Sequence, residues 1–410
     1  MGAIPPGFTA NVAGRLEIGG HDCEALVAKA GDTPVFVYDV ALIRRKIEAL
    51  RTALPPSVAL HYAIKANPLP DLVRAIAPFV DGLDVASAGE MESVLPLGMP
   101  ISFAGPGKRD RELEAAIAAG VTLNLESEGE AERALAAGSK LGMRPRLAVR
   151  VNPDFDLKGS GMRMGGGAKP FGVDAERAPD LIRHIRAEGA DWQGLHIFAG
   201  SQALDASAIA ETQRQTIALA AQIADAVGER PALVNLGGGF GIPYFPGDKP
   251  VDIVAVGHDL ADALAARPAI LADSRFAIEL GRYLVGEAGV YLTRIIDRKV
   301  SHGETFLVTD GGLHHQLAAS GNFGTVVRRN YPVAIASKFA EPPTETASIV
   351  GCLCTPLDRL GDQVTLPEAQ PGDLVAVFMA GAYGASASPS RFLGHPEPTE
   401  LLVNHDTIGG

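Results

Sequence analysis

Cysteine is scarce in this sequence, and its scarcity limits what the chain can be. The 410 residues contain three cysteines, Cys23, Cys352 and Cys354. Three cysteines provide no disulfide framework, so we expect a cytoplasmic protein in a reducing compartment. Cys352 and Cys354 lie close together, but no second pair of ligands follows at the spacing of a zinc site, so no metal is expected.

Basic charge and long apolar runs are also lacking. Lysine and arginine number 36 against 48 aspartate and glutamate, which gives a net charge of −12 at pH 7. An acidic chain without a basic run is a poor candidate for binding nucleic acid or an anionic membrane. No apolar run reaches the length of a membrane span, and the first residues do not form a signal peptide. We therefore expect neither nucleic acid nor membrane as a partner.

The sequence does contain a regular alternation of two kinds of segment. Eight short runs rich in β-forming or apolar residues alternate with segments of helical character, one of which opens with Ser127 and Glu130 in a capping-box pattern. The eight runs cover residues 58–64, 82–86, 99–104, 121–125, 146–151, 193–198, 232–236 and 276–280. This alternation predicts a parallel (β/α)8 barrel. An open doubly wound sheet is the alternative, although such a sheet usually has fewer strands.

After about residue 285 strands follow strands. Turn signals such as Asp310-Gly-Gly separate runs at 289–297, 305–310, 331–336, 345–354, 362–368, 373–379 and 399–403. These runs predict an antiparallel β-barrel or sandwich, to which the N-terminal residues could add a strand. The predicted fold class is therefore α/β plus all-β, with a barrel over residues 36–285 and a β domain made of 1–35 plus 286–410.

Polar residues follow every run of the predicted barrel. The active site of such a barrel lies at the carboxyl ends of its strands. The residues found there are Lys65; Asp84, Ser87 and Glu90; Lys108; Glu126; Arg150 and Asn152; His196, Ser201 and Gln202; Gly237 to Gly241; and Glu279, Gly281 and Arg282. Each also has an ordinary interpretation: a surface lysine, a tight glycine turn, a core histidine, or a carboxylate paired with a nearby arginine. The glycine-rich run 158–172 is either a loop that closes over this rim or a disordered surface loop.

Together these residues fit one cofactor. Pyridoxal phosphate needs an amine for its aldehyde, a cradle for its phosphate, a carboxylate for its ring nitrogen and a flat group against its ring. Lys65, the 237–241 glycines, Glu279 and His196 are candidates for these four roles. The glycine run is not followed by Gly-Lys-Ser/Thr, so it is not a nucleotide P-loop.

Seven motifs resemble those of fold-type III pyridoxal-phosphate decarboxylases, the family of the diaminopimelate, ornithine and arginine decarboxylases. They are Tyr62-Ala-Ile-Lys-Ala-Asn67, Gly82-Leu-Asp-Val-Ala-Ser-Ala-Gly-Glu90, His196-Ile-Phe-Ala-Gly-Ser-Gln202, Gly237-Gly-Gly-Phe-Gly241, Glu279-Leu-Gly-Arg282, Cys354-Thr-Pro-Leu-Asp358 and Gly381-Ala-Tyr383. The resemblance spans nearly the whole chain. It implies an alanine-racemase-like barrel followed by a β domain, and a homodimer with shared active sites.

The resemblance also implies roles for individual residues. Lys65 would form the Schiff base, His196 would stack on the ring, and Glu279 would hold the ring nitrogen. Asp84 and Arg150 would support Lys65 and the ring from the barrel floor. Cys354 would come from the partner subunit and protonate the substrate Cα after carbon dioxide leaves. The phosphate would be bound by Ser201, Gly238, Gly239 and Arg282, with Tyr383 nearby, and Gly237 and Gly281 would also belong to the cofactor site.

Two departures from the family bear on the substrate. Diaminopimelate decarboxylases carry a glutamate where this chain has Thr355, and an arginine where the 310–322 stretch has none. A charged distal end is therefore poorly served, and Thr355, Asp358 and His314 are the expected substrate contacts. These stretches resemble a subgroup that includes exosortase-associated proteins and a decarboxylase of glutamyl groups on an acyl-carrier protein. The expected substrate is an amino acid or a carrier-tethered aminoacyl group.

Three alternatives stay open at this point. The first is a diaminopimelate decarboxylase proper. The second is a racemase, although racemases of this fold place an arginine at the ring nitrogen where this chain has Glu279. The third is a relative that binds the cofactor without catalysis, against which the presence of both Lys65 and Cys354 argues.

Overall fold

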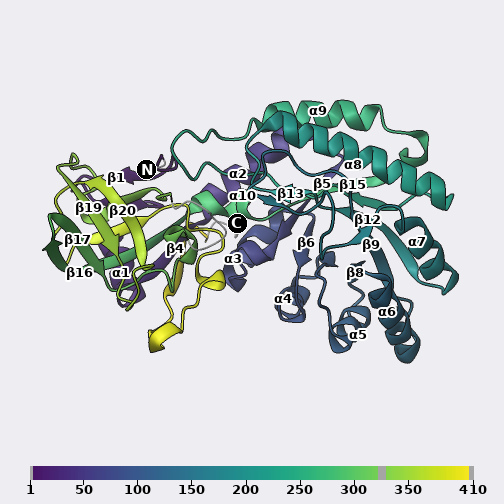
Figure 1. Cartoon of the computed structure of the whole chain (residues 1–410), viewed down its shortest axis with the longest axis horizontal. Helices are drawn as coiled ribbons and strands as arrows, with labels where there is room; N and C mark the ends of the chain where they lie inside the picture. Colours follow the sequence, from purple (N-terminus) through teal and green to yellow (C-terminus); the bar gives the residue numbers. More distant parts are fainter. Residues whose placement is uncertain (1–2, 322–328, 406–410) are drawn as a thin grey trace. The chain divides into compact units, whose positions relative to one another are not determined.

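The computed structural model describes residues 3–321 and 329–405. It consists of two compact units, whose elements are labelled in Figure 1. The barrel unit comprises Lys46–Ile242 and Pro250–Tyr283, and the β unit comprises Met1–Arg45, Pro243–Lys249 and Leu284–Gly410. Helix α2 (Val40–Ala53) contains the boundary at which the chain passes from one unit to the other, between Arg45 and Lys46.

The barrel unit is built on a closed parallel sheet. Its strands are β5 (Val58–Ala63), β6 (Gly82–Val85), β7 (Ile101–Phe103), β8 (Thr122–Leu125), β9 (Arg146–Asn152), β12 (Asp191–Ile197), β14 (Leu233–Asn235) and β15 (Arg275–Leu280). Each strand pairs in parallel with its neighbour, and the pairings of β15 with β5 and of β8 with β9 close the ring. The predicted barrel is thereby confirmed, and the open sheet is excluded.

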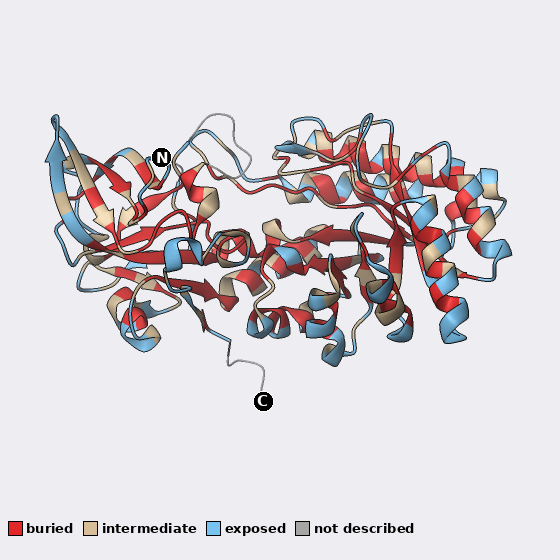
Figure 2. Cartoon of the chain, turned by 60° about the horizontal axis from the view of Figure 1, so that its bottom comes forward, coloured by how far each residue is buried: buried red, intermediate tan, exposed pale blue. Residues whose placement is uncertain are grey.

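Helices surround this sheet on the outside (Figure 2). Their outer faces are exposed, whereas the strands are buried, as expected for a barrel filled by its own side chains. They are α3 (Pro70–Ile76), α4 (Ala88–Val94), α5 (Asp110–Ala118), α6 (Glu128–Leu141), α7 (Ala178–Ala187), α8 (Ala206–Val227) and α9 (Ile253–Ala265). The short helix α10 (Arg282–Val285) follows β15. β10 (Met162–Arg163) pairs antiparallel with β13 (Gly200–Ser201), and β11 (Val173–Asp174) pairs in parallel with β9.

The start of α6 corrects one local prediction. The Ser127 hydroxyl accepts a hydrogen bond from the Glu130 backbone N–H at 3.1 Å, as the capping pattern predicts. The Glu130 carboxylate does not return to the backbone of Ser127, because it is paired with Lys108 at 2.6 Å. Only half of the capping box therefore forms, since a buried ammonium is a stronger partner than a backbone N–H near solvent.

The β unit contains an eight-stranded sheet. Its strands are β4 (Val35–Asp39), β16 (Gly289–Ser301), β17 (Glu304–Thr309), β18 (Val333–Ile335), β19 (Glu345–Val350), β20 (Arg359–Leu366), β21 (Leu374–Val377) and β22 (Thr399–Val403). The N-terminal strand expected in this sheet is β4, which pairs with β16 and β22. Residues 35–39 thus belong to the β unit, not to a barrel beginning at residue 36.

The sheet is mixed, which corrects the purely antiparallel prediction. β17 pairs in parallel with β19, and β4 pairs in parallel with β22. Neither pair is joined by a hairpin: a long connection separates β17 from β19, and β4 and β22 come from opposite ends of the chain. Only a short connection forces two strands to run antiparallel, so the direction of these pairs was open in the sequence.

The N-terminal segment has regular structure of its own. β1 (Thr9–Ala10), β2 (Leu16–Ile18) and β3 (His21–Asp22) form a small antiparallel sheet, and helix α1 (Cys23–Ala30) follows. The Asp22 side chain caps α1 by accepting hydrogen bonds from the N–H groups of Glu24 and Ala25.

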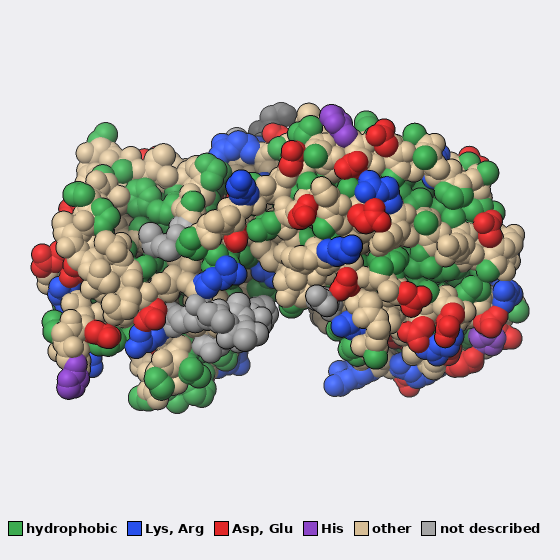
Figure 3. All heavy atoms as spheres, turned by 45° about the horizontal axis from the view of Figure 1, so that its top comes forward, with side chains coloured by type: hydrophobic (Ala, Val, Ile, Leu, Met, Phe, Trp, Pro, Cys, Tyr) green, Lys and Arg blue, Asp and Glu red, His purple; other side chains and the backbone are tan. Residues whose placement is uncertain are grey.

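The length of the helices and the distribution of surface charge bear on the expected partners. None of the helices within residues 3–321 and 329–405 is both long enough and apolar enough to cross a bilayer. On the face drawn in Figure 3, acidic and basic side chains are interspersed over the barrel unit instead of gathering by sign.

Candidate active site

A pocket of about 240 Å³ opens at the carboxyl ends of the barrel strands. Its lining includes five of the side chains that the sequence placed at strand ends, namely Lys65, Asp84, Arg150, His196 and Glu279. The barrel therefore brings together residues that are separated by more than two hundred positions in the chain.

Lys65 lies directly after β5. It belongs to a single helical turn, Ile64–Ala66. The Tyr62 hydroxyl donates a hydrogen bond to the Asn67 carbonyl at 2.9 Å and so joins the two sides of this turn. The Lys65 side chain is exposed, and its Nζ lies 6.0 Å from the centre of the Phe198 ring. This turn holds a reachable amine at the edge of the pocket.

Glu279 is the central acid of the pocket. Its Oε2 lies 3.1 Å from His196 Nε2 and accepts a hydrogen bond from Asn235 Nδ2 at 3.1 Å. The contact with His196 lacks hydrogen-bond geometry, so both ring nitrogens of His196 have no hydrogen-bond partner among the described residues. Burial alone would raise the pKa of Glu279, but His196, Lys65 and Arg150 outweigh it and hold that pKa well below its usual value. The lowered pKa favours the charged carboxylate form of Glu279.

Asp84 and His61 form a second acid–base pair on the barrel floor. Asp84 Oδ1 lies 3.5 Å from His61 Nδ1, and neither Asp84 oxygen has a hydrogen-bond partner among the described residues. Burial and the charge of Glu279 raise the pKa of Asp84. Burial lowers the pKa of His61, but the Asp84 carboxylate outweighs it, so the pKa of His61 lies above its usual value. The pKa values of both groups therefore lie above their usual values.

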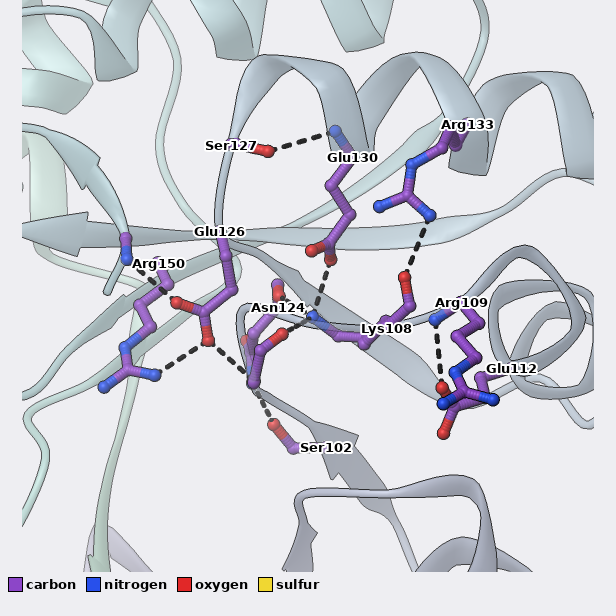
Figure 4. Close-up of polar contacts among 12 residues, drawn as sticks. Ser102, Lys108, Arg109, Glu112, Asn124, Glu126, Ser127, Glu130, Arg133 and Arg150 are labelled. Atoms are coloured by element: carbon purple, nitrogen blue, oxygen red, sulfur yellow. Dashed lines mark hydrogen bonds and ion pairs between the residues drawn. The ribbon is translucent and has the colours of Figure 1, made fainter. Parts of the chain in front are cut away.

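Arg150 is held by Glu126, as Figure 4 shows. Glu126 Oε1 accepts from Arg150 Nη1 at 2.8 Å and from the Gly105 N–H at 2.6 Å, and its Oε2 accepts from the Gly172 N–H at 2.8 Å. Burial raises the pKa of Glu126, but Arg150, Lys108 and the Gly105 N–H together bring it below its usual value. One carboxylate therefore ties together the ends of β7 and β9 and the glycine-rich run 158–172.

A buried ion pair lies behind this carboxylate (Figure 4). Lys108 Nζ binds Glu130 Oε1 at 2.6 Å and donates to the carbonyls of Gly105 and Asn124. Burial lowers the pKa of Lys108 and raises that of Glu130, each opposed by the other's charge. The pair supports the loop after β7, so Lys108 is a buried structural residue and not a surface lysine.

The glycine run after β14 forms a cradle. Gly237 and Gly239 have φ of 69° and 82°, values that side chains rarely adopt. A methyl group on Gly239 would overlap the Gly200 carbonyl, and one on Gly238 would overlap the Glu279 carbonyl. Only bare backbone fits here, and the neighbouring Ser201 hydroxyl has no hydrogen-bond partner among the described residues. Gly281 leaves room against Ala66, and Arg282 opens α10.

These observations fit pyridoxal phosphate. A cradle without side chains beside a Ser201 hydroxyl suits a phosphate. A charged Glu279 suits a protonated ring nitrogen, and the unpartnered groups of His196 and Asp84 suit further contacts with the ring. The residues that the sequence proposed for this cofactor are therefore chemically able to hold it.

The residues predicted to donate the proton and to contact the substrate lie in the β unit. Cys354 is exposed, and the Thr355 hydroxyl accepts from the Leu357 N–H at 3.3 Å. Asp358 is buried, and its carboxylate accepts from the N–H groups of Leu313 and Leu353 at 2.6 and 2.9 Å. Burial raises the pKa of Asp358, opposed by those two bonds. Asp358 thus shapes the loop that carries Cys354 and Thr355.

His314 and Tyr383 also belong to the β unit. His314 is fully buried, and Tyr383 has a φ of 54°. The roles of Cys354, Thr355, Asp358, His314 and Tyr383 at a substrate or cofactor stay predictions. Asn322, the last residue of the 310–322 stretch, lies outside the described residues.

Several residues in the pocket or next to its acids were not singled out in the sequence. Phe198 and Phe171 line it, the latter with its ring 5.1 Å from the Arg150 guanidinium. His61 and Asn235 contact the two central acids. Asn235 could have been noticed as a polar residue directly before the glycine run, whereas Phe171 lies in a loop whose path no sequence pattern indicates.

Comparison with known proteins agrees with the predicted cofactor and enzyme class. Residues 40–286 match the family model described as pyridoxal-dependent decarboxylase, pyridoxal binding domain. The chain is 36% identical over 385 residues to L-glutamyl-[BtrI acyl-carrier protein] decarboxylase of Niallia circulans, which covers 92% of this chain and 90% of that one. It is 31% identical to diaminopimelate decarboxylase of Aquifex aeolicus, over 96% of this chain and 92% of the relative.

A solved structure gives the same result. Diaminopimelate decarboxylase of M. jannaschii superposes with a TM-score of 0.85 at 25% identity, covering 96% of this chain and 92% of that one. The alanine-racemase-like fold, the cofactor and the enzyme class predicted from the sequence are confirmed. The chain belongs to the fold-type III pyridoxal-phosphate-dependent decarboxylases, the family of the ornithine and diaminopimelate decarboxylases.

Proposed function

We propose that this decarboxylase removes the α-carboxylate of a carrier-tethered aminoacyl group, or of an amino acid whose distal end is uncharged. The observation that carries the decarboxylase assignment is Glu279, charged and buried in the same pocket as Lys65. Bound pyridoxal phosphate supplies a protonated ring that accepts the electron pair left when the carboxylate departs. A carboxylate at the ring nitrogen maintains that protonation.

The residues of the barrel hold the cofactor and position it. Lys65 is the amine that holds the cofactor covalently and releases it to the substrate amine. Ser201, Gly238, Gly239 and Arg282 bind the phosphate in the cradle after β14. His196 lies against the ring, fixed from behind by its 3.1 Å contact with Glu279.

The proton that replaces carbon dioxide at Cα comes from Cys354 in this proposal. Cys354 is exposed in the β unit and belongs to the Cys354–Asp358 motif that the family resemblance assigns to the active site of the partner subunit. The proposal therefore includes a homodimer in which the β unit of one chain completes the barrel site of the other.

The preference for a carrier-tethered substrate rests on the distal end of the site. Thr355 stands in the place of a glutamate, and the described part of the 310–322 stretch contains no arginine. A neutral distal end has no need of either charge. The relative that decarboxylates an L-glutamyl group on an acyl-carrier protein is 36% identical to this chain, which supports the same substrate class.

Carbon dioxide release tests the proposal. Holoenzyme is incubated with free glutamate, free diaminopimelate and glutamyl-loaded acyl-carrier protein, and released carbon dioxide is measured. We expect turnover of the carrier-bound substrate well above that of either free acid. Faster turnover of free diaminopimelate would instead support the diaminopimelate decarboxylase alternative.

The residue roles are tested separately. Lys65→Ala should abolish the visible absorbance of covalently held cofactor, and persistence of that band would show that the lysine assignment is wrong. Cys354→Ala should slow turnover while cofactor stays bound, and mixing it with Lys65→Ala protein should partly restore activity through hybrid dimers. Absence of restoration would contradict a shared site. A chiral product assay distinguishes racemisation, and absence of any turnover distinguishes a non-catalytic relative.

A further inference from the structure

Three potential metal ligands meet in the β unit. His314 follows β17, Cys352 follows β19, and His395 lies just before β22. Their ligand atoms all lie within 4.8 Å of one another. Cys352 Sγ is 3.7 Å from His395 Nε2 and 3.9 Å from Nδ1, and the rings of His314 and His395 have centres 4.9 Å apart.

His314 is the member whose surroundings are incomplete. Its side chain is fully buried, and neither ring nitrogen has a hydrogen-bond partner among the described residues. Buried polar atoms without partners are costly, so a native protein rarely keeps two on one ring. The adjacent His315 shows the usual arrangement, since its nitrogens contact the Tyr291 hydroxyl at 3.1 Å and the Pro396 carbonyl at 2.9 Å.

The spacing of the cluster matches a tetrahedral metal. Zn–S and Zn–N bonds of about 2.3 and 2.0 Å place sulfur and nitrogen ligands about 3.5 Å apart around a tetrahedral ion. The distances from Cys352 to His395 are already close to that value, and the ligand atoms of all three residues lie within 4.8 Å of one another. Without a metal, the Cys352 thiol donates to the Asp310 carbonyl oxygen at 3.4 Å, a bond that a metal-bound thiolate would give up.

We propose that His314, Cys352 and His395 bind a divalent transition metal of the zinc class, with three protein ligands and one open coordination position. One thiolate and two imidazoles are the ligands that such ions prefer over Mg²⁺ or Ca²⁺. Binding releases the thiol proton of Cys352. This site goes beyond the proposed decarboxylation, and neither inference depends on the other.

The site also has a consequence for the neighbouring motif. Cys352 precedes the proposed proton donor Cys354 by two residues, and the Asp358 carboxylate already binds the backbone between them. A metal at Cys352 therefore fixes one end of that loop to the 312–316 turn and to the segment before β22. It also gives His314 a ligand role in place of the direct substrate contact predicted from the sequence.

Metal content of the intact holoenzyme tests the site. Tag-free protein is treated with a chelator, reloaded with Zn²⁺, desalted and analysed by atomic emission. We expect about one ion per chain, falling to below about 0.1 in Cys352→Ser and in His395→Gln. His302→Gln, a change at an exposed turn histidine, is the matched control and should keep the ion.

Cobalt shows whether the ion is bound by these ligands. Co²⁺ in a tetrahedral site with a thiolate ligand has strong visible bands at wavelengths longer than the pyridoxal absorbance, and Cys352→Ser should abolish them. Lys65→Ala protein, which should hold no covalent cofactor, should keep them. Unaltered melting and cofactor absorbance show that the half-buried Cys352 and His395 variants are folded. The proposal is wrong if the wild type retains no ion, if the variants retain as much as the wild type, or if the cobalt spectrum is octahedral.

Discussion

Glu126 is expected to be the strongest single structural contact of the cofactor pocket. It occupies the gap between the ends of β7 and β9 and the 158–172 run, and it accepts hydrogen bonds from the buried Arg150 and from two half-buried backbone N–H groups. Its side chain is 2% exposed and that of Arg150 is 10% exposed. Glu126→Ala would leave Arg150 as a buried cation without its carboxylate and two backbone N–H groups without an acceptor.

The size of the loss follows from these contacts. Removing one partner of a buried ion pair costs about 3–5 kcal/mol, because the remaining charge stays buried and unpaired. A loss of about 4 kcal/mol lowers the folding equilibrium constant roughly a thousandfold. The two N–H groups can turn to water once the side chain is gone, so we do not add a separate cost for them.

Glu128 provides a matched control two residues away. Its carboxylate pairs with Arg177 at 2.8 Å, the same distance as Glu126 to Arg150, but the two side chains are 47% and 52% exposed. A pair exposed to this degree contributes about 0.2–1 kcal/mol. Glu128→Ala should therefore lie close to the wild type.

Urea unfolding followed by tryptophan fluorescence measures the difference. The single tryptophan, Trp192, is buried in β12, so its signal reports the barrel unit alone. Cofactor-free protein is used, because bound cofactor adds its own stabilisation. The reasoning is refuted if Glu126→Ala destabilises the barrel unit no more than Glu128→Ala does.

Three further predictions concern the same pocket. The pKa of Glu126 is lower in the folded state, so the stability it contributes is present above about pH 4.3 and is lost as pH falls through the lower folded pKa. The free energy of unfolding, measured between neutral and acid pH, should therefore fall less steeply in Glu126→Gln than in the wild type. An unchanged slope would contradict this. Gly239→Ala should abolish cofactor binding in equilibrium dialysis, because its methyl group meets the Gly200 carbonyl. Gly228→Ala is the control: its φ is also positive, at 76°, but the space around it is open, so the change should only strain the backbone by about 1–2 kcal/mol. Glu279→Gln should keep cofactor bound and lower kcat about a hundredfold, which corresponds to about 2.7 kcal/mol in the activation free energy. This is part of the roughly 4 kcal/mol that an ion pair at 4 Å contributes at an effective dielectric of about 20. A kcat within threefold of the wild type would show that Glu279 does not act on the ring nitrogen.

Much of the barrel could be predicted because its information is local. A buried parallel strand is a short apolar run, and the residue that follows it lies on the rim whatever the rest of the chain does. Lys65, Asp84, Arg150, His196 and Glu279 were found in this way, and the pocket contains all five. The glycines at 237–239 were recognisable for a similar reason, since a run of glycine marks backbone that must come close to something.

Pairings between distant segments could not be predicted. Glu130 was assigned to its own helix cap, yet it is bound to Lys108 from the preceding loop. The parallel pairs β17–β19 and β4–β22 depend on long connections whose paths have no sequence signal. His61 and Asn235 became recognisable as partners of Asp84 and Glu279 only when their strands were side by side.

The three cysteines show the same division. By itself the sequence determined that no disulfide framework exists and that Cys354 belongs to a family motif, because both follow from counting and from adjacent residues. It gave no reason to expect a metal at Cys352, since the spacing rule looks for ligands nearby in the chain. Only the tertiary structure brings His314 and His395 to that thiol, because ligands meet through folded backbone and not through sequence order.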